Sequence, residues 1–198
     1  NTQVTGFEKS GNTVKAVITD KGKIDAEKVI LCGGSWSGEL ADLLGFNLPM
    51  MGGKGYSFLQ ENKPEIMQSS ILTEMKVAVS PYGEQIRFGG TMEIAGTNQK
   101  VNLNRVKGIF ESINRFYPEF EAKFPEESKI WKGLRPCSPD GLPYIGFAPG
   151  YSNVMVNSGH SMMGVSLAPA SGKIISELHQ QKDTTLGLNG FEVGRYSK

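Results

Sequence analysis

Apolar residues in this chain gather in short runs that end in glycine, a pattern typical of buried strands that lead into tight turns. Residues 28–37 read KVILCGGSWS, so that β-branched and apolar residues come directly before Gly33 and Gly34. Residues 153–172 read NVMVNSGHSMMGVSLAPASG, with a strand predicted at residues 154–156. Each run predicts a buried strand, a glycine-containing turn and then a helix.

Apolar residues also recur at the spacing of one helix face in three segments. Residues 37–44 predict a helix that Gly45 caps. Residues 102–117 predict an amphipathic helix that ends at Pro118, because proline cannot continue a helix. The apolar positions of this second helix are Val106, Ile109, Phe110, Ile113 and Phe116. A third helix is predicted after Gly164, and its apolar positions are Ala168, Ile174, Ile175 and Leu178.

Strands are predicted in two further regions, where apolar and polar residues alternate. Residues 1–28 look like paired strands with Gly11 and Gly22 at their turns. A second set of alternating strands begins after Pro49 and precedes the amphipathic helix. The strands predicted in this set are residues 56–59, 77–80 and 86–89.

The composition is that of a globular protein. The chain has 198 residues, enough for one or two domains, and 38% of them are hydrophobic, which argues against disorder. A formal net charge of +1 supplies no field that would attract nucleic acid or anionic lipid. Cys32 and Cys137 are the only cysteines, and no Cys/His cluster has metal-ligand spacing. We therefore expect no nucleic-acid partner, no metal site, no transmembrane segment and a reducing cytosol as the location.

Two loops carry residues with binding chemistry. The turn with Gly159 and Gly164 stands at the start of a predicted helix, where unpaired backbone N–H groups can bind a polar or anionic ligand. Such a turn also occurs as a plain connection between a strand and a helix. Residues 130–146 read IWKGLRPCSPDGLPYIG, in which three prolines stiffen a loop around Arg135. An arginine held in this way is suited to pair with a carboxylate, although an arbitrary arginine more often forms a surface or structural ion pair.

In this order, these segments resemble the C-terminal part of the FAD-dependent D-amino-acid oxidase and dehydrogenase family, which includes glycine oxidase and sarcosine oxidase. One shared motif is an apolar strand that ends in a glycine pair before Trp36 and Ser37. The others are Gly-Leu-Arg-Pro with a downstream Pro-Asp-Gly-Leu-Pro, and a Gly-His-x-x-x-Gly turn followed by Leu-Ala-Pro-Ala-Ser-Gly. Residues 52–59 and 77–90 also resemble strands of the family's substrate-side sheet.

The resemblance implies a mixed α+β and α/β fold in two domains. An incomplete FAD-binding domain of Rossmann type would contain residues 1–49 and, after a return of the chain, residues 135–198. Residues 50–134 would form a substrate-binding domain, a mixed β-sheet with flanking helices. The FAD-binding domain would then be discontinuous in the sequence.

The resemblance also implies which residues serve the cofactor and the substrate. Arg135 would be the catalytic residue that pairs with the substrate carboxylate, and Tyr56 and Met92 would be further substrate contacts. For His160 we favour a turn residue that bonds its neighbours, and Met162 and Met163 are equally compatible with core packing. The residues expected at the cofactor are Gly33, Gly34, Trp36, Gly133, Gly159, His160, Ser161, Met162, Met163, Gly164, Val165 and Ser166.

The implied activity is oxidation of the amine of a small amino acid by hydride transfer to FAD, most like that of the bacterial D-amino-acid dehydrogenases. The imino acid formed would hydrolyse to a 2-oxo acid and ammonia. The electron acceptor would be oxygen or a quinone, and the location the cytoplasm or the periphery of the inner face of the membrane. A sarcosine or glycine oxidase-like activity is the alternative, and a covalent flavin on Cys137 would point to it. The flavin-bearing cysteine of those relatives falls at Arg135, two positions earlier, which favours noncovalent FAD.

One family motif has no counterpart in this sequence. The fingerprint G-x-G-x-x-G, whose backbone holds the FAD pyrophosphate, is missing. We therefore expect a fragment that enters the cofactor domain partway and binds FAD weakly or not at all. The alternative from another class is a catalytically inactive truncated domain without bound cofactor.

Overall fold

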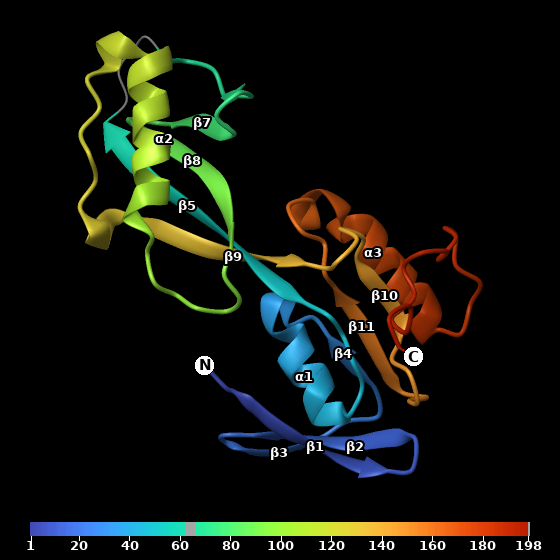
Figure 1. Ribbon diagram of the computed structural model, residues 1–198. Coiled ribbons are helices and arrows are strands. Elements are labelled where there is room, and N and C mark those ends of the chain that lie inside the picture. The colour runs from blue at the N-terminus through green and yellow to red at the C-terminus, as the bar shows by residue number, and fades with distance from the viewer. Residues whose placement is uncertain (62–65, 198) are drawn as a thin grey trace. The chain divides into compact units, whose positions relative to one another are not determined.

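The computed structural model describes residues 1–61 and 66–197, which form two compact units (Figure 1). Unit 1 comprises Asn1–Gly52 together with Arg135–Lys198, and unit 2 comprises Gly53–Leu134. Two segments distant in the sequence therefore fold together in unit 1. The expected cofactor and substrate roles of the chain's segments are not tested by this division and stay predictions.

Unit 1 contains a three-stranded antiparallel sheet made by the N-terminal residues. The chain turns between the first two strands at Gly11, whose φ of 57° lies in the left-handed region that glycine adopts without steric penalty. The strands pair in the order β1-β2-β3, and their bounds are β1 (Val4–Ser10), β2 (Thr13–Thr19) and β3 (Gly22–Asp25). The paired strands predicted for this region are confirmed.

A second sheet of unit 1 joins strands from both of its segments. Its order is β10-β11-β4, in which β11 is parallel to β4 and antiparallel to β10. The bounds are β4 (Val29–Leu31), β10 (Tyr144–Phe147) and β11 (Val154–Ser158). The strand predicted at residues 154–156 is thus confirmed and two residues longer, whereas β10 was not predicted.

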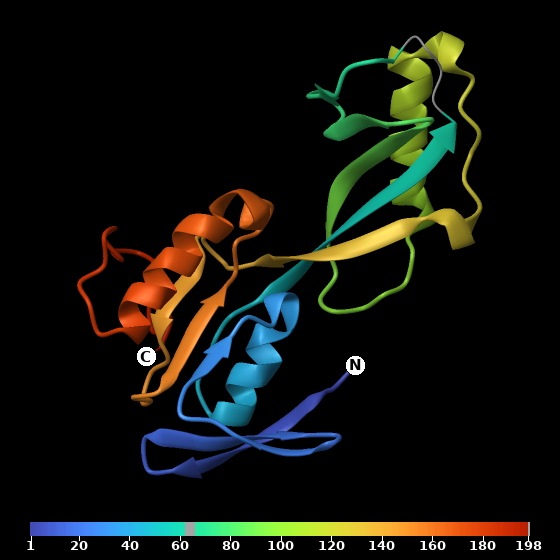
Figure 2. The same ribbon diagram turned by 180° about the vertical axis from the view of Figure 1, so that it is seen from behind.

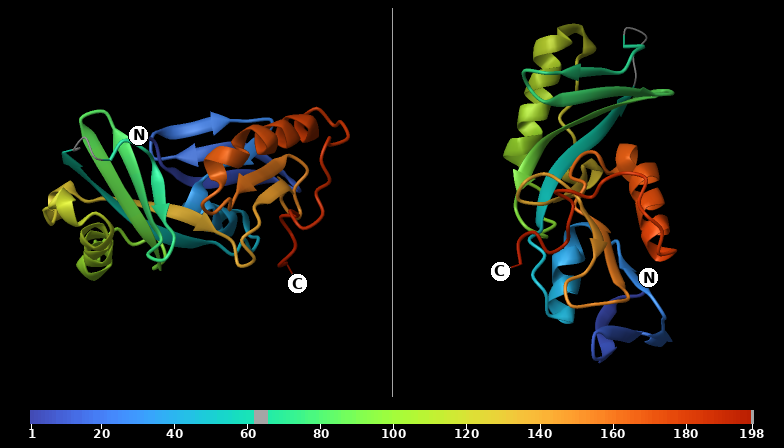
Figure 3. Two further views of the ribbon diagram at one scale, coloured as in Figure 1. Left: turned by 90° about the horizontal axis from the view of Figure 1, so that it is seen from above. Right: turned by 90° about the vertical axis from the view of Figure 1, so that its right-hand side faces the viewer.

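Helices cover both faces of this second sheet. Val154 and Val156 pack on one face with Leu44, which belongs to α1 (Ser37–Leu44). Met155 points to the other face and packs with Ile174 of α3 (Gly164–His179), because successive side chains of a strand alternate between faces. Figure 3 shows α1 and α3 on opposite sides of β10 and β11.

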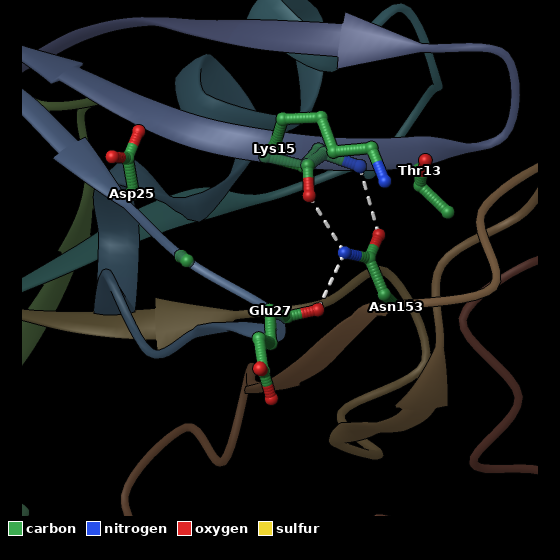
Figure 4. A pocket seen from close by; sticks show the side chains of 7 residues that line it. Thr13, Lys15, Asp25, Glu27 and Asn153 are labelled. Atoms are coloured by element: carbon green, nitrogen blue, oxygen red, sulfur yellow. Dashed lines mark hydrogen bonds between the residues drawn. The ribbon is translucent and has the colours of Figure 1, made fainter.

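Asn153 joins the two sheets of unit 1 (Figure 4). Its amide Nδ2 donates to the backbone oxygens of Val14 and Glu27, each at 2.7 Å, and its Oδ1 accepts from the backbone nitrogen of Val14 at 2.8 Å. The side chain is buried, so these bonds satisfy polar groups that water does not reach. Asn153 also lines a cavity of about 440 Å³ with Thr13 and Lys15. Because the amide is already fully engaged with the backbone, we assign it a structural role.

Unit 2 is built on a five-stranded sheet with the order β6-β7-β8-β5-β9. Strands β6, β7, β8 and β5 pair antiparallel along this order. The bounds are β5 (Met51–Glu61), β6 (Ser70–Leu72), β7 (Val77–Tyr82), β8 (Gln85–Ile94) and β9 (Trp131–Cys137). The three strands predicted here are confirmed as parts of β5, β7 and β8, and β6 was not predicted.

One helix, α2 (Leu103–Phe116), covers one face of this sheet (Figure 2). Its residues Ile109 and Ile113 pack in one core with Phe58 and Phe88 of the sheet. The side chain of Asn102 caps the helix by accepting a hydrogen bond from the backbone nitrogen of Asn104 at 3.2 Å. The amphipathic helix predicted for residues 102–117 is confirmed, with the two outermost residues acting as caps.

The remaining helices of the described chain are short. α1 begins and ends where the sequence predicts, and Gly45 follows it with a φ of 89°, the left-handed cap that glycine favours. Three short 3₁₀ helices are η1 (Gly34–Trp36), η2 (Pro118–Phe120) and η3 (Glu127–Lys129). None of the helices in the described part of the chain has the length and apolar character needed to cross a membrane. The expected mixed α+β class with flanking helices is confirmed.

Candidate functional site

The two glycine loops of unit 1 lie at the same edge of one sheet. Because β4 and β11 run parallel, with Val29 opposite Val154 and Leu31 opposite Val156, their carboxyl ends point the same way. Residues 32–34 follow β4 and residues 159–163 follow β11. In sheets of this kind, ligands bind outside the carboxyl ends of the parallel strands.

Two buried serines tie these loops together. The Ser37 hydroxyl donates to Ser158 Oγ at 2.8 Å, and Ser158 Oγ donates to the backbone oxygen of Gly34 at 3.2 Å. Ser37 and Ser158 are 0% and 3% exposed, so this chain of bonds is shielded from water. It fixes the start of α1 against the end of β11.

A helix begins in each loop without a side-chain cap. The residue before α1 is Trp36 and the residue before α3 is Met163, and neither side chain bonds the first turn of its helix. The backbone N–H groups of a first turn have no partner within their own helix and carry partial positive charge. At α1 the 3₁₀ helix η1 comes directly before this turn, and the Ser37 backbone nitrogen donates to the oxygen of Gly34, so the backbone donors of this edge are those at the start of α3. Around the start of α3 the side chains of Met162, Met163 and Val165 are exposed. This edge therefore combines backbone donors with apolar surface.

The turn after β11 requires glycine at position 159. Gly159 has a φ of 85°, and a Cβ added there would lie 3.1 Å from Tyr144 Cδ2. Ser161 follows with a φ of 53°, and its backbone nitrogen donates to the oxygen of Pro136 at 2.8 Å. His160 forms a backbone bridge with Cys137. These contacts hold the turn beside the end of β9.

The same contacts position Arg135 near the turn through the backbone of β9. Arg135 is half-buried, two residues before Cys137, whose Sγ donates to the Arg135 backbone oxygen at 3.4 Å. Ser161 Oγ in turn donates to Cys137 Sγ at 3.4 Å. Cys137 is 8% exposed. The thiol is therefore buried between Arg135 and the glycine turn.

The proline-rich loop after Arg135 is clamped by a residue near the C-terminus. Arg195 donates to both carboxylate oxygens of Asp140, at 2.9 and 3.0 Å, and to the backbone oxygen of Leu142 at 2.7 Å. Its guanidinium carbon lies 3.9 Å from the centre of the Tyr144 ring. The hydrogen bond from Arg195 is the main reason why the pKa of Asp140 lies well below its usual value. Burial raises the pKa of Tyr144 to about 12.

His160 bonds within its own loop and helix. Its Nε2 lies 2.8 Å from Ser171 Oγ of α3, and burial lowers the pKa of the imidazole. Burial therefore favours the neutral form of the ring, and the contact with Ser171 links the turn to the helix. Its contact with a cofactor stays a prediction.

Most of the residues expected at the cofactor come together at this edge. Gly33, Gly34 and Trp36 lie in the loop after β4. Eight more of the expected residues, all of residues 159–166, follow β11 in unit 1. Gly133 belongs to unit 2 and is not among them. A Cβ added at Gly133 would lie 2.4 Å from the ring of Trp131, so the indole fills the space beside this glycine. The cofactor roles of Gly133 and of the eleven residues in the two loops all stay predictions.

The residues expected beside the substrate are divided between the two units. Tyr56 lies in the core of unit 2, where its hydroxyl donates to Glu93 Oε2 at 2.6 Å and accepts from the backbone nitrogen of Asn102 at 3.1 Å. Burial is the main cause of its raised pKa. Met92 on β8 is 37% exposed. Both substrate roles stay predictions.

The loop edge of unit 1 fits part of a flavin cofactor. Ser35, in the turn after Gly34, is 5% exposed, and within the described residues its Oγ has no hydrogen-bond partner. A buried hydroxyl without a partner is costly unless a bound polar group satisfies it. The uncapped start of α3 suits a polar group, and Trp36, Met162 and Met163 suit a flat ring. Within residues 1–61 and 66–197, no group of three or more His, Cys, Asp or Glu residues could hold a metal ion.

Sequence reasoning missed two parts of this arrangement. The Ser37–Ser158 bond joins residues 121 positions apart, and the Asp140–Arg195 pair joins residues 55 positions apart. A serine at the end of a buried strand, or an acidic residue in a proline-rich loop, does not indicate in the sequence which residue it will bond. Only their pairing in space reveals what they do.

Comparison with known proteins places the chain among FAD-dependent oxidoreductases. The pattern of the family described as FAD dependent oxidoreductase (DAO) matches residues 1–178. Glycine oxidase from Pseudomonas aeruginosa is 34% identical over 177 residues, which cover 89% of this chain and 48% of that protein. D-amino acid dehydrogenase from Bradyrhizobium diazoefficiens is 32% identical over 200 residues, which cover 100% of this chain and 47% of that protein. The chain spans about half the length of the curated relatives that it matches.

Solved structures show the same fold. Glycine oxidase from Geobacillus kaustophilus superposes with a TM-score of 0.86 at 24% identity, covering 98% of this chain and 52% of that one. L-proline dehydrogenase from P. horikoshii superposes with a TM-score of 0.85 at 22% identity, covering 98% of this chain and 54% of that one.

Proposed function

Because the chain belongs to the FAD-dependent oxidoreductase family, we propose that the protein oxidises the amine of a small amino acid with FAD. The observation that carries this proposal is the edge of unit 1 where the loops after β4 and β11 meet. Two buried serines join these loops, and each loop begins a helix without a side-chain cap. Such an edge can bind one part of a cofactor through backbone groups without side-chain rearrangement.

FAD, when bound, would accept the hydride from the substrate Cα. The chain's own residues would orient the reactants. The Arg135 guanidinium would pair with both oxygens of the substrate carboxylate, which fixes the position of Cα. The imino acid left by hydride loss would hydrolyse to a 2-oxo acid and ammonia. Since Nε2 of His160 lies 2.8 Å from Ser171 Oγ of α3, we assign His160 to holding the turn and give it no proton-transfer role.

Noncovalent attachment of FAD is supported by the surroundings of Cys137. Its thiol is buried and bonded to the backbone of Arg135 and to Ser161, so attack on a flavin ring would require the loop to open. In this proposal Cys137 is a small packing residue. The missing pyrophosphate fingerprint leads us to propose that this chain alone binds FAD weakly or not at all.

Two other functions remain as alternatives. A sarcosine or glycine oxidase-like activity is supported by the identity to glycine oxidase, which is close to the identity to D-amino acid dehydrogenase. A truncated domain without cofactor or activity is supported by the missing fingerprint. Oxygen or a quinone as the electron acceptor, and the cytoplasm or the inner face of the membrane as the location, are part of the same proposal.

Because we propose that this chain alone binds FAD weakly or not at all, the test uses the parent protein loaded with FAD, called the flavin-loaded enzyme below. Anaerobic reduction of this enzyme tests the proposed reaction. We expect small amino acids to bleach the visible absorption of the flavin. Those with a primary amine should release a 2-oxo acid and ammonia in equal amounts, and sarcosine should release methylamine in place of ammonia. D-amino acids, glycine and sarcosine should be compared, because preference among them separates the dehydrogenase-like and oxidase-like activities. Absence of bleaching by every amino acid, in an enzyme that dithionite still reduces, would contradict the proposal.

A further inference from the structure

Unit 2 contains a cavity that the proposed amine oxidation does not use. Leu59 and Arg87 are cross-strand partners in the sheet, and Phe58 and Phe88 are the next pair along the same strands. Phe58 and Phe88 point into the core beneath α2, so Leu59 and Arg87 lie on the opposite face. The cavity on this face has a volume of about 500 Å³, which suits a small organic ligand.

Arg87 and Trp131 are held in place at this cavity before any ligand binds. Arg87 Nε donates to Ser57 Oγ at 3.1 Å, and the guanidinium carbon lies 5.1 Å from the centre of the Trp131 ring. The indole rests against Gly133, where a Cβ would come within 2.4 Å of it. Arg87 is therefore fixed by a hydroxyl and an aromatic face, which limits the entropy lost on binding.

One of the two cations at the cavity, Arg87, has no carboxylate partner among the residues that the structure describes. Lys129, at the cavity, forms an exposed ion pair with Glu126 at 3.3 Å. Arg87 forms no ion pair with any carboxylate in residues 1–61 and 66–197. Its planar guanidinium is suited to bind a carboxylate through two parallel hydrogen bonds.

The rest of the cavity offers exposed apolar and aromatic surface. Trp131 is 60% exposed and Tyr82 is 78% exposed, and both contribute to its wall. Leu59 adds an aliphatic side chain between them. An aromatic ring can stack on such surfaces while an attached anionic group reaches the guanidinium.

We propose that this cavity binds a small ligand in which a carboxylate is attached to a flat apolar ring. Arg87 pairs with the carboxylate, and Trp131 and Tyr82 contact the ring. The site lies wholly within unit 2 and does not depend on Arg135, so it goes beyond the proposed oxidation.

Titration of the 198-residue chain with 3-phenylpropanoate tests this site. Because the chain has only two tryptophans, the W36F variant leaves Trp131 as the sole reporter of emission. We expect a saturable change in Trp131 emission, and no saturable change with the neutral amide 3-phenylpropanamide. Equal binding of the acid and the amide, or no saturable change with the acid, would overturn the proposal.

Matched charge changes locate the carboxylate. R87Q and K129Q each remove one positive charge at the cavity, but only Arg87 lacks a pairing carboxylate in the described part of the chain. We expect R87Q to weaken binding at least tenfold and K129Q less than threefold, with thermal unfolding checked for each variant. Isothermal titration calorimetry on the chain with both tryptophans gives an independent affinity. Equal losses in the two variants would mean nonspecific attraction and would overturn the proposal.

R135Q separates this site from the proposed substrate carboxylate site. It should leave the affinity for 3-phenylpropanoate unchanged. If R135Q abolishes binding and R87Q does not, the probe occupies the carboxylate site of the proposed oxidase and the cavity proposal is wrong. A failure to oxidise amino acids, together with Arg87-dependent probe binding, would instead contradict only the proposed function.

Discussion

Ser37 donates its hydroxyl to Ser158 over 2.8 Å in the interior of unit 1, although the two residues are 121 positions apart in the sequence. Ser37 begins α1 and Ser158 ends β11. The bond therefore joins the two loops that we propose to bind FAD. Because both side chains are buried, their contribution to folding can be measured.

Removing one of the two hydroxyls should destabilise unit 1. S158A leaves the Ser37 hydroxyl buried without its acceptor, which costs on the order of 1–3 kcal/mol in free energy of unfolding. Urea denaturation measures the change. S37A combined with S158A should cost less than the sum of the single variants, since no hydroxyl is then left unpaired. S152A, which removes an exposed hydroxyl, is the control and should change stability by less than about 0.5 kcal/mol. Additive costs of the two buried variants would show that the hydroxyls act independently.

Glycine at position 159 should be required by the backbone. G159A places a Cβ 3.1 Å from Tyr144 in a residue with a φ of 85°, so we expect a loss of roughly 1–2 kcal/mol or more in unfolding free energy. G172A is the matched control, because Gly172 lies inside α3 with nothing within 4 Å of the added Cβ. This control should stabilise the chain by up to about 1 kcal/mol. Thermal unfolding of both variants measures these changes. If G159A leaves the stability unchanged, the turn can rearrange and does not require glycine.

The Asp140–Arg195 pair should make stability depend on pH in the acid range. The hydrogen bond that Arg195 donates to Asp140 holds the pKa of this carboxyl group below its value in the unfolded chain, about 3.9. The pair therefore contributes stability above about pH 4, and this contribution is lost as the pH falls toward the folded pKa. D140N should destabilise by on the order of 1 kcal/mol at pH 7, since the carboxylate is partly exposed.

Chemical denaturation of the D140N variant at pH 7 and pH 3 measures this dependence. The difference from the parent chain should shrink at pH 3. The exposed pair Glu8–Lys23 supplies the control, and E8Q should change stability by less than about 0.5 kcal/mol at either pH. A D140N effect that is the same at both pH values would show that charge is not what Asp140 contributes.

Cys137 should not carry the flavin. After acid precipitation of the flavin-loaded enzyme, we expect all flavin in the supernatant, because the buried thiol is bonded to Ser161 and to the backbone of Arg135. C137S should retain its flavin content and its absorption spectrum. Flavin that stays with the precipitated protein, and is lost in C137S, would show covalent attachment and favour the sarcosine oxidase-like alternative.

Local signals in the sequence were enough to predict much of the fold. The bounds of α1 follow from its apolar spacing and from Gly45, which caps it in the left-handed conformation. Strand β11 was predicted because three consecutive apolar residues precede a turn. Strand β10 was not predicted, since its residues lie within a proline-rich stretch that resembles a loop. Its strand conformation comes from pairing with β11, a tertiary effect.

The candidate site was harder to predict than the fold. Glycine turns identify the loops of unit 1, because a positive φ at Gly159 is a local property. By contrast, the space beside Gly133 is taken by Trp131, and the hydroxyl of Tyr56 is taken by Glu93. Neither contact can be read from spacing along the chain. Side-chain partners that come from other elements appear only once the chain is folded.

The central claim is that Arg135 binds the substrate carboxylate, and one ratio of rate constants tests it most directly. The measurement is kcat/KM for an amino acid divided by kcat/KM for the amine that lacks only its carboxylate, in the flavin-loaded enzyme with and without R135A. Loss of a bidentate pair should cost on the order of 2–4 kcal/mol for the amino acid and little for the amine. We therefore predict that R135A lowers this ratio at least about 30-fold. An unchanged ratio, with both substrates impaired equally, would show that Arg135 only supports the loop and would contradict the account.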